Sequence, residues 1–485
     1  MSFICHEVNR RLFKWTPWYK RSMFPSILVQ FSLLCGIWAL VTGSAACQQR
    51  PPPLLLVSFD GFRADYLQRF PMPNLTLLYS QGVLVEELTN VFITKTFPNH
   101  YSLVTGLYAE SHGILASSMY DPIRHKHFHV SNRSDAMWWN EATPIWISAH
   151  QAGYKTAVAM WPGSDVAIHN QTPTHFFPYS PDVTFRERLG NVTNWLLGSE
   201  KEEGVMFAAL YWEEPDRSGH LFGPENTSAI GKVLKEVDDN IGLLKSELKR
   251  TGLWGRVNVL VTSDHGMAQC SADRLIRLDD CLHPDNYTVV DLTPVAALIP
   301  NNKPEAVFAL LDKCHTHMTA YLKEAIPDSL HYRNNERIQP IILIADEGWT
   351  IIQRGNKLPR LGDHGYDNSL PSMHPFMAAW GPSFRGGYRL KSLQSVDLYP
   401  LMCHLLALAP QPNNGTLAKA RCMLVGECWQ DGLALIGLVL GILIVFATIP
   451  VLLKLMVRRL RPSTSSAFRR LQVDHGNDEE ESLLE

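Results

Sequence analysis

Residues 54–61 read LLLVSFDG, an almost wholly apolar run that is followed by an acidic residue and a glycine. A short run without polar alternation is typical of a parallel strand that is covered on both faces. The pattern returns at Thr156–Trp161, Val205–Trp212 and Val257–Thr262. These four segments predict the central strands of a sheet.

The sequence predicts one helix between the last two of these strands. Apolar residues recur with a period of 3.6 from Ile230 to Leu248, and Ser228 and Gly252 are suitable residues for its start and its end. Strands that alternate with helices predict an α/β fold with a mostly parallel central sheet flanked by helices. A further strand-like run, Ile341–Ala345, lies in an irregular region.

Composition narrows the range of functions. The chain has 485 residues, 46% of them hydrophobic, which is enough for one large α/β domain or two smaller ones. Its formal net charge of −3 provides no basic field, which argues against electrostatic binding of nucleic acid.

Residues 1–46 have the pattern of a secretory signal peptide. Ser26–Val41 is its apolar region, and small residues follow it at 42–46. The preceding 25 residues are long for such a signal, so Met23 is a possible true start. The alternative is a signal anchor that stays uncleaved.

A second apolar stretch, Gly432–Leu453, contains no charged residue and is long enough to cross a bilayer. Basic residues follow it at once, from Lys454 to Arg461, which predicts that this side is cytoplasmic. We therefore expect a type I membrane protein in the plasma membrane, with an extracellular catalytic domain at 47–410, a stalk at 411–431 and a cytoplasmic tail at 454–485.

The tail ends in an acidic run and a leucine pair. Glu479 precedes Leu483 and Leu484 at the spacing of an acidic dileucine sorting signal, which would bind a sorting adaptor. A solvated disordered tail is the alternative. Seven sequons for N-glycosylation all lie in the predicted ectodomain and support this topology: Asn74, Asn132, Asn170, Asn191, Asn226, Asn286 and Asn414.

Cysteines in an oxidising compartment are expected to pair where geometry allows. Cys422 and Cys428 can close a short loop before the membrane span, and Cys281 and Cys314 are a second candidate pair. Cys47, Cys270 and Cys403 are left over, and Cys5 and Cys35 belong to the signal region. Sequence alone does not fix this connectivity.

Candidate metal ligands lie where strands or helices end. Asp60 follows the first strand, Asp264 and His265 follow the Val257–Thr262 strand, and His364 lies in the polar loop Leu361–Pro375. Asp216 and His220 are four residues apart, so a helical turn would place both on one face. Ligands bind at the carboxyl ends of parallel strands, so these side chains are expected to meet.

Taken singly, each of these residues has an ordinary structural interpretation. Asp60 could cap a turn, His265 could be a core histidine, and Asp216 could be a solvated charge. Together, three aspartates and three histidines fit two mixed nitrogen and oxygen sites, which suit Zn²⁺ better than Mg²⁺ or Ca²⁺. Two such ions about 4 Å apart clamp an in-line phosphoryl displacement.

The nucleophile candidate is Thr96, in the stretch Asn90–Gly106 (NVFITKTFPNHYSLVTG). His100–Thr105 can be helical, so Thr96 lies where a helix would start. Free backbone N–H groups at such a start favour an anionic substrate. A hydroxyl is a poor nucleophile until its pKa is lowered, as a bound metal would do.

Seven motifs carry a resemblance to a known family: FDGFRADY (59–66), TKTFPNHYSLVTGLY (94–108), ESHGI (110–114), MWPGSD (160–165), YWEEPDRSGH (211–220), TSDHGM (262–267) and DHGYDNSLPSMHP (363–375). Across residues 53–431 the chain resembles the ectonucleotide pyrophosphatase/phosphodiesterase family of the alkaline phosphatase superfamily. The resemblance implies an alkaline-phosphatase-like sheet and a hydrolase that forms a covalent nucleotidyl-threonine.

The resemblance also assigns roles to residues. It implies one zinc ion on Asp216, His220 and His364. The second zinc ion would be held by Asp60, Thr96, Asp264 and His265. Thr96 matches the family nucleophile, and Phe97 and Tyr179 match the aromatic residues that stack a nucleobase. Unaided, we would expect Phe97 and Tyr179 to be core residues.

One position departs from the family pattern. The family usually has Asn where this chain has Ser117, and that Asn donates to a phosphate oxygen. Loss of such a donor costs on the order of a hundredfold in rate. We therefore expect an active enzyme that is slower than its relatives.

Three functions fit these observations. The first is cleavage of dinucleoside polyphosphates such as diadenosine triphosphate, or of nucleotide pyrophosphate bonds generally. The second is hydrolysis of choline phosphodiesters or lysophospholipids, which Phe97 and Tyr179 favour less because a flat base suits them better than an acyl chain. The third is a catalytically weak surface protein for adhesion or signalling. The complete ligand set argues against the third function, and Ser117 argues slightly for it.

Overall fold

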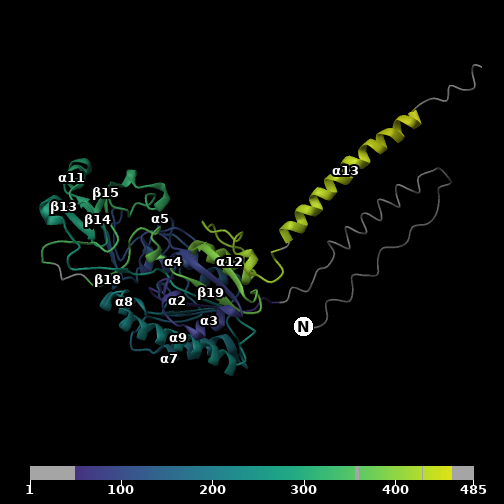
Figure 1. Ribbon diagram of the computed structural model, residues 1–485, viewed down its shortest axis with the longest axis horizontal. Coiled ribbons are helices and arrows are strands. Elements are labelled where there is room, and N and C mark those ends of the chain that lie inside the picture. The colour runs from purple at the N-terminus through teal and green to yellow at the C-terminus, as the bar shows by residue number, and fades with distance from the viewer. Residues whose placement is uncertain (1–49, 356–359, 429, 461–485) are drawn as a thin grey trace, which may run out of the picture. The chain divides into compact units, whose positions relative to one another are not determined.

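The computed structural model describes residues 50–355, 360–428 and 430–460 (Figure 1). The expected signal peptide, Met23, Cys47 and the dileucine pair Leu483–Leu484 lie outside the described residues. So does the part of the expected cytoplasmic tail that begins at residue 461.

A central eight-stranded sheet organises the described domain. In spatial order its strands are β20 (Tyr388–Gln394), β2 (Val83–Thr89), β19 (Met377–Trp380), β10 (Asn258–Thr262), β1 (Leu54–Phe59), β9 (Phe207–Trp212), β5 (Thr156–Ala159) and β6 (His175–Phe177). All neighbours pair in parallel except β19, which is antiparallel to both β10 and β2. The expected mostly parallel sheet is confirmed.

Helices cover both faces of this sheet because its central strands are apolar on both sides. Leu55, Val57 and Phe59 of β1 pack into a core shared with α3 (Pro73–Ser80), α7 (Phe185–Leu197) and α9 (Thr227–Arg250). Figure 1 shows α7 and α9 lying together on that side.

The opposite face of the sheet has its own core. Leu54 and Leu56 of β1 pack into a second cluster with residues of α4 (Thr96–Thr105), α6 (Ile145–Gln151) and α12 (Leu398–Leu405). The alternation of side chains along one strand therefore supplies two separate cores.

The ends of some elements differ from expectation. Asn226, not Ser228, caps α9, because its side-chain oxygen accepts the Ala229 N–H at 3.1 Å. Strand β5 ends at Ala159, two residues early, and Met160 then has a positive φ of 64°. A tight turn after a strand depends on contacts with other segments, which the local sequence does not show. The apolar run Thr156–Trp161 therefore predicts a strand that is longer than the one observed.

The irregular region after Thr262 contains a second sheet, which has the order β13 (Tyr287–Asp291), β14 (Val295–Pro300), β16 (Ile341–Ala345) and β15 (Met318–Leu322). The strand expected at Ile341–Ala345 is thus an inner strand of an antiparallel sheet, with α11 (Pro304–Leu311) packed in the same core.

Short elements complete the described chain. The helices are α2 (Tyr66–Arg69), α5 (Ala109–His112), α8 (Asp216–Phe222) and α10 (Leu278–Cys281). The strands pair two by two: β3 (Ser118–Asp121) with β4 (Lys126–His129), β7 (Gly198–Ser199) with β8 (Glu202–Glu203), β11 (Ala268–Gln269) with β18 (Gly362–Asp363), and β12 (Leu275–Arg277) with β17 (Thr350–Ile352).

Two disulfides are formed, Cys281–Cys314 and Cys422–Cys428, which are the two pairs suggested by the sequence. Cys270 and Cys403 are free and buried. The last described helix, α13 (Gln430–Leu460), contains a stretch from Ile436 to Leu460 that is long and apolar enough to cross a membrane. This stretch is a candidate membrane anchor.

Candidate active site

Three acidic residues meet at the carboxyl edge of the central sheet. Strands β10, β1 and β9 are neighbours, and they are followed by Asp264, Asp60 and, four residues after β9, Asp216. Because the three strands are parallel, their carboxyl ends lie at the same edge. Strand order therefore places Asp60 between the other two carboxylates.

A glycine permits this close approach. The Asp216 N–H donates to the Asp60 carbonyl at 2.9 Å, and Gly61 lies directly against Asp216 with a φ of +68°. A Cβ at Gly61 would lie 2.8 Å from the Asp216 Cα. A side chain at Gly61 would be strained and would push Asp216 away.

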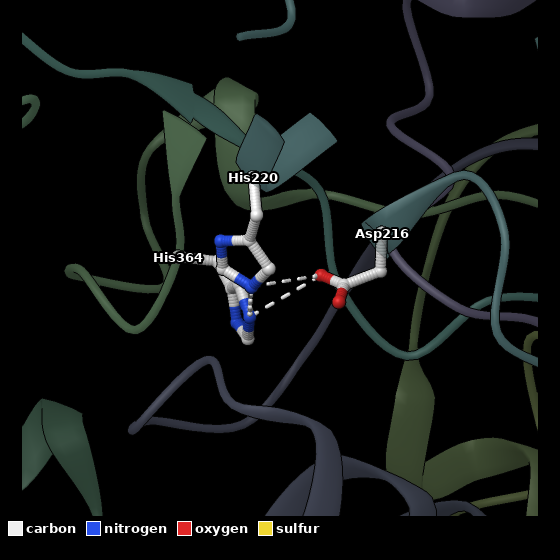
Figure 2. A group of neighbouring side chains, drawn as sticks. All are labelled: Asp216, His220 and His364. Atoms are coloured by element: carbon white, nitrogen blue, oxygen red, sulfur yellow. Dashed lines mark hydrogen bonds and ion pairs between the residues drawn. The ribbon is translucent and has the colours of Figure 1, made fainter. Parts of the chain in front are cut away.

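The first group of candidate ligands consists of Asp216, His220 and His364. Asp216 and His220 come from one face of α8, and His364 follows β18. The Asp216 Oδ1 atom is 3.4 Å from His220 Nε2 and 3.3 Å from His364 Nε2. Figure 2 shows both rings turned toward this one oxygen.

The tautomers of these histidines are set by backbone carbonyls. His220 Nδ1 donates to the Gly362 carbonyl at 2.8 Å, and His364 Nδ1 donates to the Thr94 carbonyl at 2.9 Å. Each Nε2 then carries a lone pair, and the two Nε2 atoms are only 3.2 Å apart. Two lone pairs and a carboxylate oxygen converging on one point fit a bound cation.

The second group consists of Asp60, Thr96, Asp264 and His265. His265 Nε2 lies 3.4 Å from Asp60 Oδ1, 3.1 Å from Asp264 Oδ2 and 3.2 Å from Thr96 Oγ1. The His265 Nδ1 donates to the Gly266 carbonyl at 2.8 Å, so Nε2 again carries a lone pair. Thr96 is the first residue of α4, as its position before a helical run predicts.

His100 also lies beside this group, and the sequence analysis did not identify it. Ligand atoms of Asp60, His100 and Asp264 lie within 4.8 Å of one another. However, His100 Nδ1 faces the Thr96 carbonyl at 2.9 Å, and its Nε2 lies 2.9 Å from Ser58 Oγ. Both ring nitrogens thus have hydrogen-bond partners, so His100 helps to position Asp264 and Thr96 and is not itself a ligand. In the sequence, His100 lies between Asn99 and Tyr101 and belongs to no pattern that predicts this role.

The two groups are adjacent. Ligand atoms of Asp60, Asp216 and His265 also lie within 4.8 Å of one another, which joins one group to the other. The rings of His265 and His364 stack with their centroids 3.6 Å apart. The six aspartate and histidine residues predicted from sequence are therefore brought together, with Thr96 beside them.

Unpaired carboxylate oxygens mark the inside of the site. Asp60 Oδ1, Asp216 Oδ1 and Asp264 Oδ2 are buried and accept no hydrogen bond from any described residue. Burial, together with repulsion from Asp264 and Asp216, raises the pKa of Asp60 well above its usual range. Such a cluster of carboxylates is costly by itself and is stabilised by cations.

Tyr211 holds Asp60 in place, and sequence reasoning missed it as well. Its hydroxyl donates to Asp60 Oδ2 at 2.6 Å, which leaves Oδ1 to face the other ligands. Burial and the negative charge of Asp60 raise the pKa of Tyr211 well above its usual range, so the hydroxyl keeps its proton.

A cavity of about 310 Å³ opens beside Thr96, and we call it the base cavity. Phe97, Ser117 and Tyr179 line it together with Asp60 and Asp216. Phe97 is partly buried and Tyr179 is exposed, so neither is a fully buried core residue. Arg133 and Asp165, which pair at 3.2 Å, also line this cavity.

Arg188 of α7 anchors the segment that carries Tyr179. This fully buried guanidinium donates to the carbonyls of Ser180, Val183 and Tyr211, and it binds both carboxylate oxygens of Glu213 at 2.8 and 3.2 Å. It thereby ties the loop after Tyr179 to the end of β9.

Comparison with known proteins identifies the family of this chain. The family described as "Type I phosphodiesterase / nucleotide pyrophosphatase" matches residues 54–367. The chain is 55% identical over 453 residues to the bis(5'-adenosyl)-triphosphatase ENPP4 of Bos taurus, covering 93% of this chain and 99% of the relative. It is 46% identical to human ectonucleotide pyrophosphatase/phosphodiesterase family member 5, covering 81% of this chain and 83% of the relative.

Solved structures give the same result. The structure of murine ENPP5 aligns with a TM-score of 0.75 at 46% identity, covering 77% of this chain and all of that one. A second murine ENPP5 structure, which aligns equally well, is of an inactive threonine-to-alanine variant in complex with AMP. The chain therefore belongs to the type I phosphodiesterase / nucleotide pyrophosphatase family, and it is an enzyme.

Proposed function

We propose that this protein is a zinc-dependent hydrolase of the cell surface that cleaves the pyrophosphate linkage of dinucleoside polyphosphates. Diadenosine triphosphate would give AMP and ADP through a covalent nucleotidyl-threonine. The relatives named bis(5'-adenosyl)-triphosphatase support this substrate, and the AMP complex of murine ENPP5 supports a nucleotide in the same fold.

The observation that carries the proposal is the position of Thr96 beside two groups of metal ligands. Its Oγ1 is 3.2 Å from His265 Nε2, and it opens into the base cavity together with Asp60 and Asp216. Beside Thr96 lie the buried carboxylates of Asp60 and Asp264, the partly buried carboxylate of Asp216 and three imidazoles with free lone pairs, which together would bind the cations that activate its hydroxyl.

The donor set fits two zinc ions. Asp216, His220 and His364 would hold one ion, and Asp60, Thr96, Asp264 and His265 the other, because mixed imidazole and carboxylate donors suit zinc. When bound, the ions would supply positive charge to the attacking and leaving oxygens and lower the pKa of the Thr96 hydroxyl.

The proposed reaction has two steps. Thr96 Oγ1 loses its proton and forms a bond to the phosphorus of one AMP unit, while the bond from that phosphorus to the ADP oxygen breaks. Water then attacks the same phosphorus, releases AMP and returns the proton to Thr96. One water molecule is consumed for each AMP and ADP formed.

Phe97 and Tyr179 supply the binding of the base. Both line the base cavity, and Arg188 fixes the loop that follows Tyr179. A flat purine between two aromatic rings gains stacking and buries apolar area. This shape favours a nucleotide over an acyl chain, which leaves hydrolysis of choline phosphodiesters as the alternative outcome of the test.

The location is part of the proposal. The α13 helix would anchor the chain, with residues 47–431 outside the cell and the tail from Lys454 in the cytoplasm, where the dileucine pair Leu483–Leu484 could meet a sorting adaptor. The run of basic residues after the apolar stretch supports this orientation.

The test uses the full chain, purified in detergent with zinc, and diadenosine triphosphate in water enriched in ¹⁸O. We expect equal amounts of AMP and ADP, with the heavy oxygen in AMP alone. Thr96→Ala should abolish turnover, whereas zinc should stay bound because Asp60, Asp264 and His265 would still hold the second ion. Thr227→Ala is the matched control, because Thr227 is also the first residue of a helix but is exposed. Turnover of a choline phosphodiester in place of the nucleotide would refute the proposal.

A further inference from the structure

A second cavity of about 630 Å³ meets the base cavity, and we call it the exit cavity. Tyr179, Tyr211 and Asp216 line both cavities, so they form the boundary between the two. The exit cavity is large enough for a second nucleotide. Nothing in the reaction described above uses it.

Two arginines give the exit cavity a positive surface. Arg217 of α8 and Arg360 line it, and both are exposed. Within the described part of the chain, neither guanidinium forms a hydrogen bond or an ion pair, so both are available to an anion. Two acidic residues share this lining: Glu213 is already neutralised by two contacts to Arg188, and Asp216 is one of the candidate metal ligands.

Two leucines give it an apolar surface beside these charges. Leu221 is 64% exposed and Leu361 is 48% exposed, which is unusual for large apolar side chains that line a cavity. Leu221 is four residues after Arg217 on α8, so the two share a helix face. The Leu361 N–H donates to the His220 carbonyl at 3.1 Å, which fixes Leu361 beside α8.

The nucleophile and the leaving group of the proposed reaction lie on the sides of different cavities. Thr96 lines the base cavity, whereas Asp216 and His220 of the other ligand group line the exit cavity. An in-line displacement expels the leaving group on the side opposite the nucleophile. The leaving group therefore emerges on the side where Arg217 and Leu221 lie.

We propose that the exit cavity is a binding site for the leaving nucleoside diphosphate, with its phosphates on Arg217 and Arg360 and its base against Leu221 and Leu361. This inference rests on the proposed function and extends it. Such a site would make the enzyme selective for substrates with a nucleoside at both ends. An inorganic pyrophosphate leaving group would contact the arginines but not the leucines.

Three substrates with the same adenylyl group separate these contributions. The leaving group of the p-nitrophenyl ester of AMP carries no phosphate, that of ATP carries phosphates without a nucleoside, and that of diadenosine triphosphate carries both. The variants are Arg217→Glu and Leu221→Ser in the full-length chain. Arg256→Glu is the matched control, since Arg256 is exposed just before the amino end of β10, far from the carboxyl edge.

Arg217→Glu should lower kcat/KM for ATP and for diadenosine triphosphate about tenfold, as loss of one charge-assisted contact does, and leave the p-nitrophenyl ester unchanged. Leu221→Ser should lower kcat/KM for diadenosine triphosphate severalfold and leave the other two substrates unchanged. Arg256→Glu should change none of the three.

Two other sets of results would contradict either this inference alone or the proposed function as well. If both variants cleave diadenosine triphosphate as fast as the unchanged enzyme, or if they slow all three substrates equally, the exit cavity does not bind the leaving nucleotide. If the unchanged enzyme cleaves the p-nitrophenyl ester but not diadenosine triphosphate, the proposed function itself fails, and this inference fails with it.

Discussion

The Nε2 atoms of His220 and His364 lie 3.2 Å apart, and neither carries a proton, since each ring donates its Nδ1 proton to a backbone carbonyl. Two unshielded lone pairs at this distance repel each other. Burial and the neighbouring histidines His265 and His220 lower the pKa of His364 well below its usual range, so the His364 ring stays neutral. A shared cation relieves the repulsion.

His220→Ala should therefore remove one zinc ion per chain and lower the rate of hydrolysis by about a hundredfold or more, as loss of a metal ligand does. Metal content by mass spectrometry and turnover of diadenosine triphosphate measure the two effects. His150→Ala, an exposed histidine at the end of α6, is the control and should change neither. Full metal content in His220→Ala would show that the three side chains do not form a metal site.

Ser117→Asn should raise kcat about tenfold or more, because it adds an amide donor to the wall of the base cavity where the phosphate would lie. Steady-state kinetics with diadenosine triphosphate measure the change. Ser118→Asn is the control, because Ser118 does not line the base cavity. An unchanged kcat in Ser117→Asn would show that the donor has no role in this enzyme.

Arg188→Lys should raise KM for nucleotide substrates about tenfold, because a lysine cannot replace the fork of donors that holds the Ser180 and Val183 carbonyls. The loop would then no longer position Tyr179. A phosphodiester without a nucleobase, such as bis-p-nitrophenyl phosphate, should keep its KM. Arg186→Lys on the same helix, which is exposed, is the control. An equal loss for both substrates would point to general destabilisation instead.

His112 should make the fold sensitive to acid. Its Nδ1 accepts the Ile114 N–H at 3.1 Å and its Nε2 lies 2.9 Å from Ser102 Oγ. Burial, with a smaller contribution from the charge of Arg337, lowers the pKa of His112 to about 3. Between pH 6.5 and about 3 the unfolded chain binds a proton there that the folded chain does not, so stability falls as pH falls, by about 1.4 kcal/mol per pH unit.

His112→Gln should therefore lose less stability than the unchanged protein when the pH is lowered from 7 to 5. The thermal unfolding midpoint at the two pH values measures this, and His150→Gln is the control because His150 is exposed. Parallel decreases in all three proteins would show that His112 does not contribute to acid sensitivity.

The topology can be tested through the sequons. Asn170 is exposed in a loop, so Asn170→Gln should remove one glycan and shift the apparent mass of the protein from cells. Asn74 is only half-buried, but its Nδ2 donates to the buried Asp238 at 2.9 Å. We therefore expect Asn74→Gln to cause a smaller shift, or none. An unchanged mass in Asn170→Gln would show that Asn170 carries no glycan.

The sequence by itself determined the central strands, the ligand types and the positions of the ligands at strand ends. Leu54–Phe59 and Val257–Thr262 are mostly apolar because helices cover both faces of the sheet, and this signal is local. The i, i+4 spacing of Asp216 and His220 is local too, and so is the start of a helix at Thr96. Motifs with such fixed spacing also carried the family resemblance, including the departure at Ser117.

Only the tertiary structure decided which atoms face one another. The order β10-β1-β9 brings Asp60, Asp216 and Asp264 together although they lie far apart in the sequence. The antiparallel strand β19, the second sheet and the support from His100, Tyr211 and Arg188 likewise depend on contacts between distant segments. Hydrogen-bond partners far apart in the chain leave no periodic pattern in it, which is why the ligands could be predicted from sequence while the groups that orient them could not.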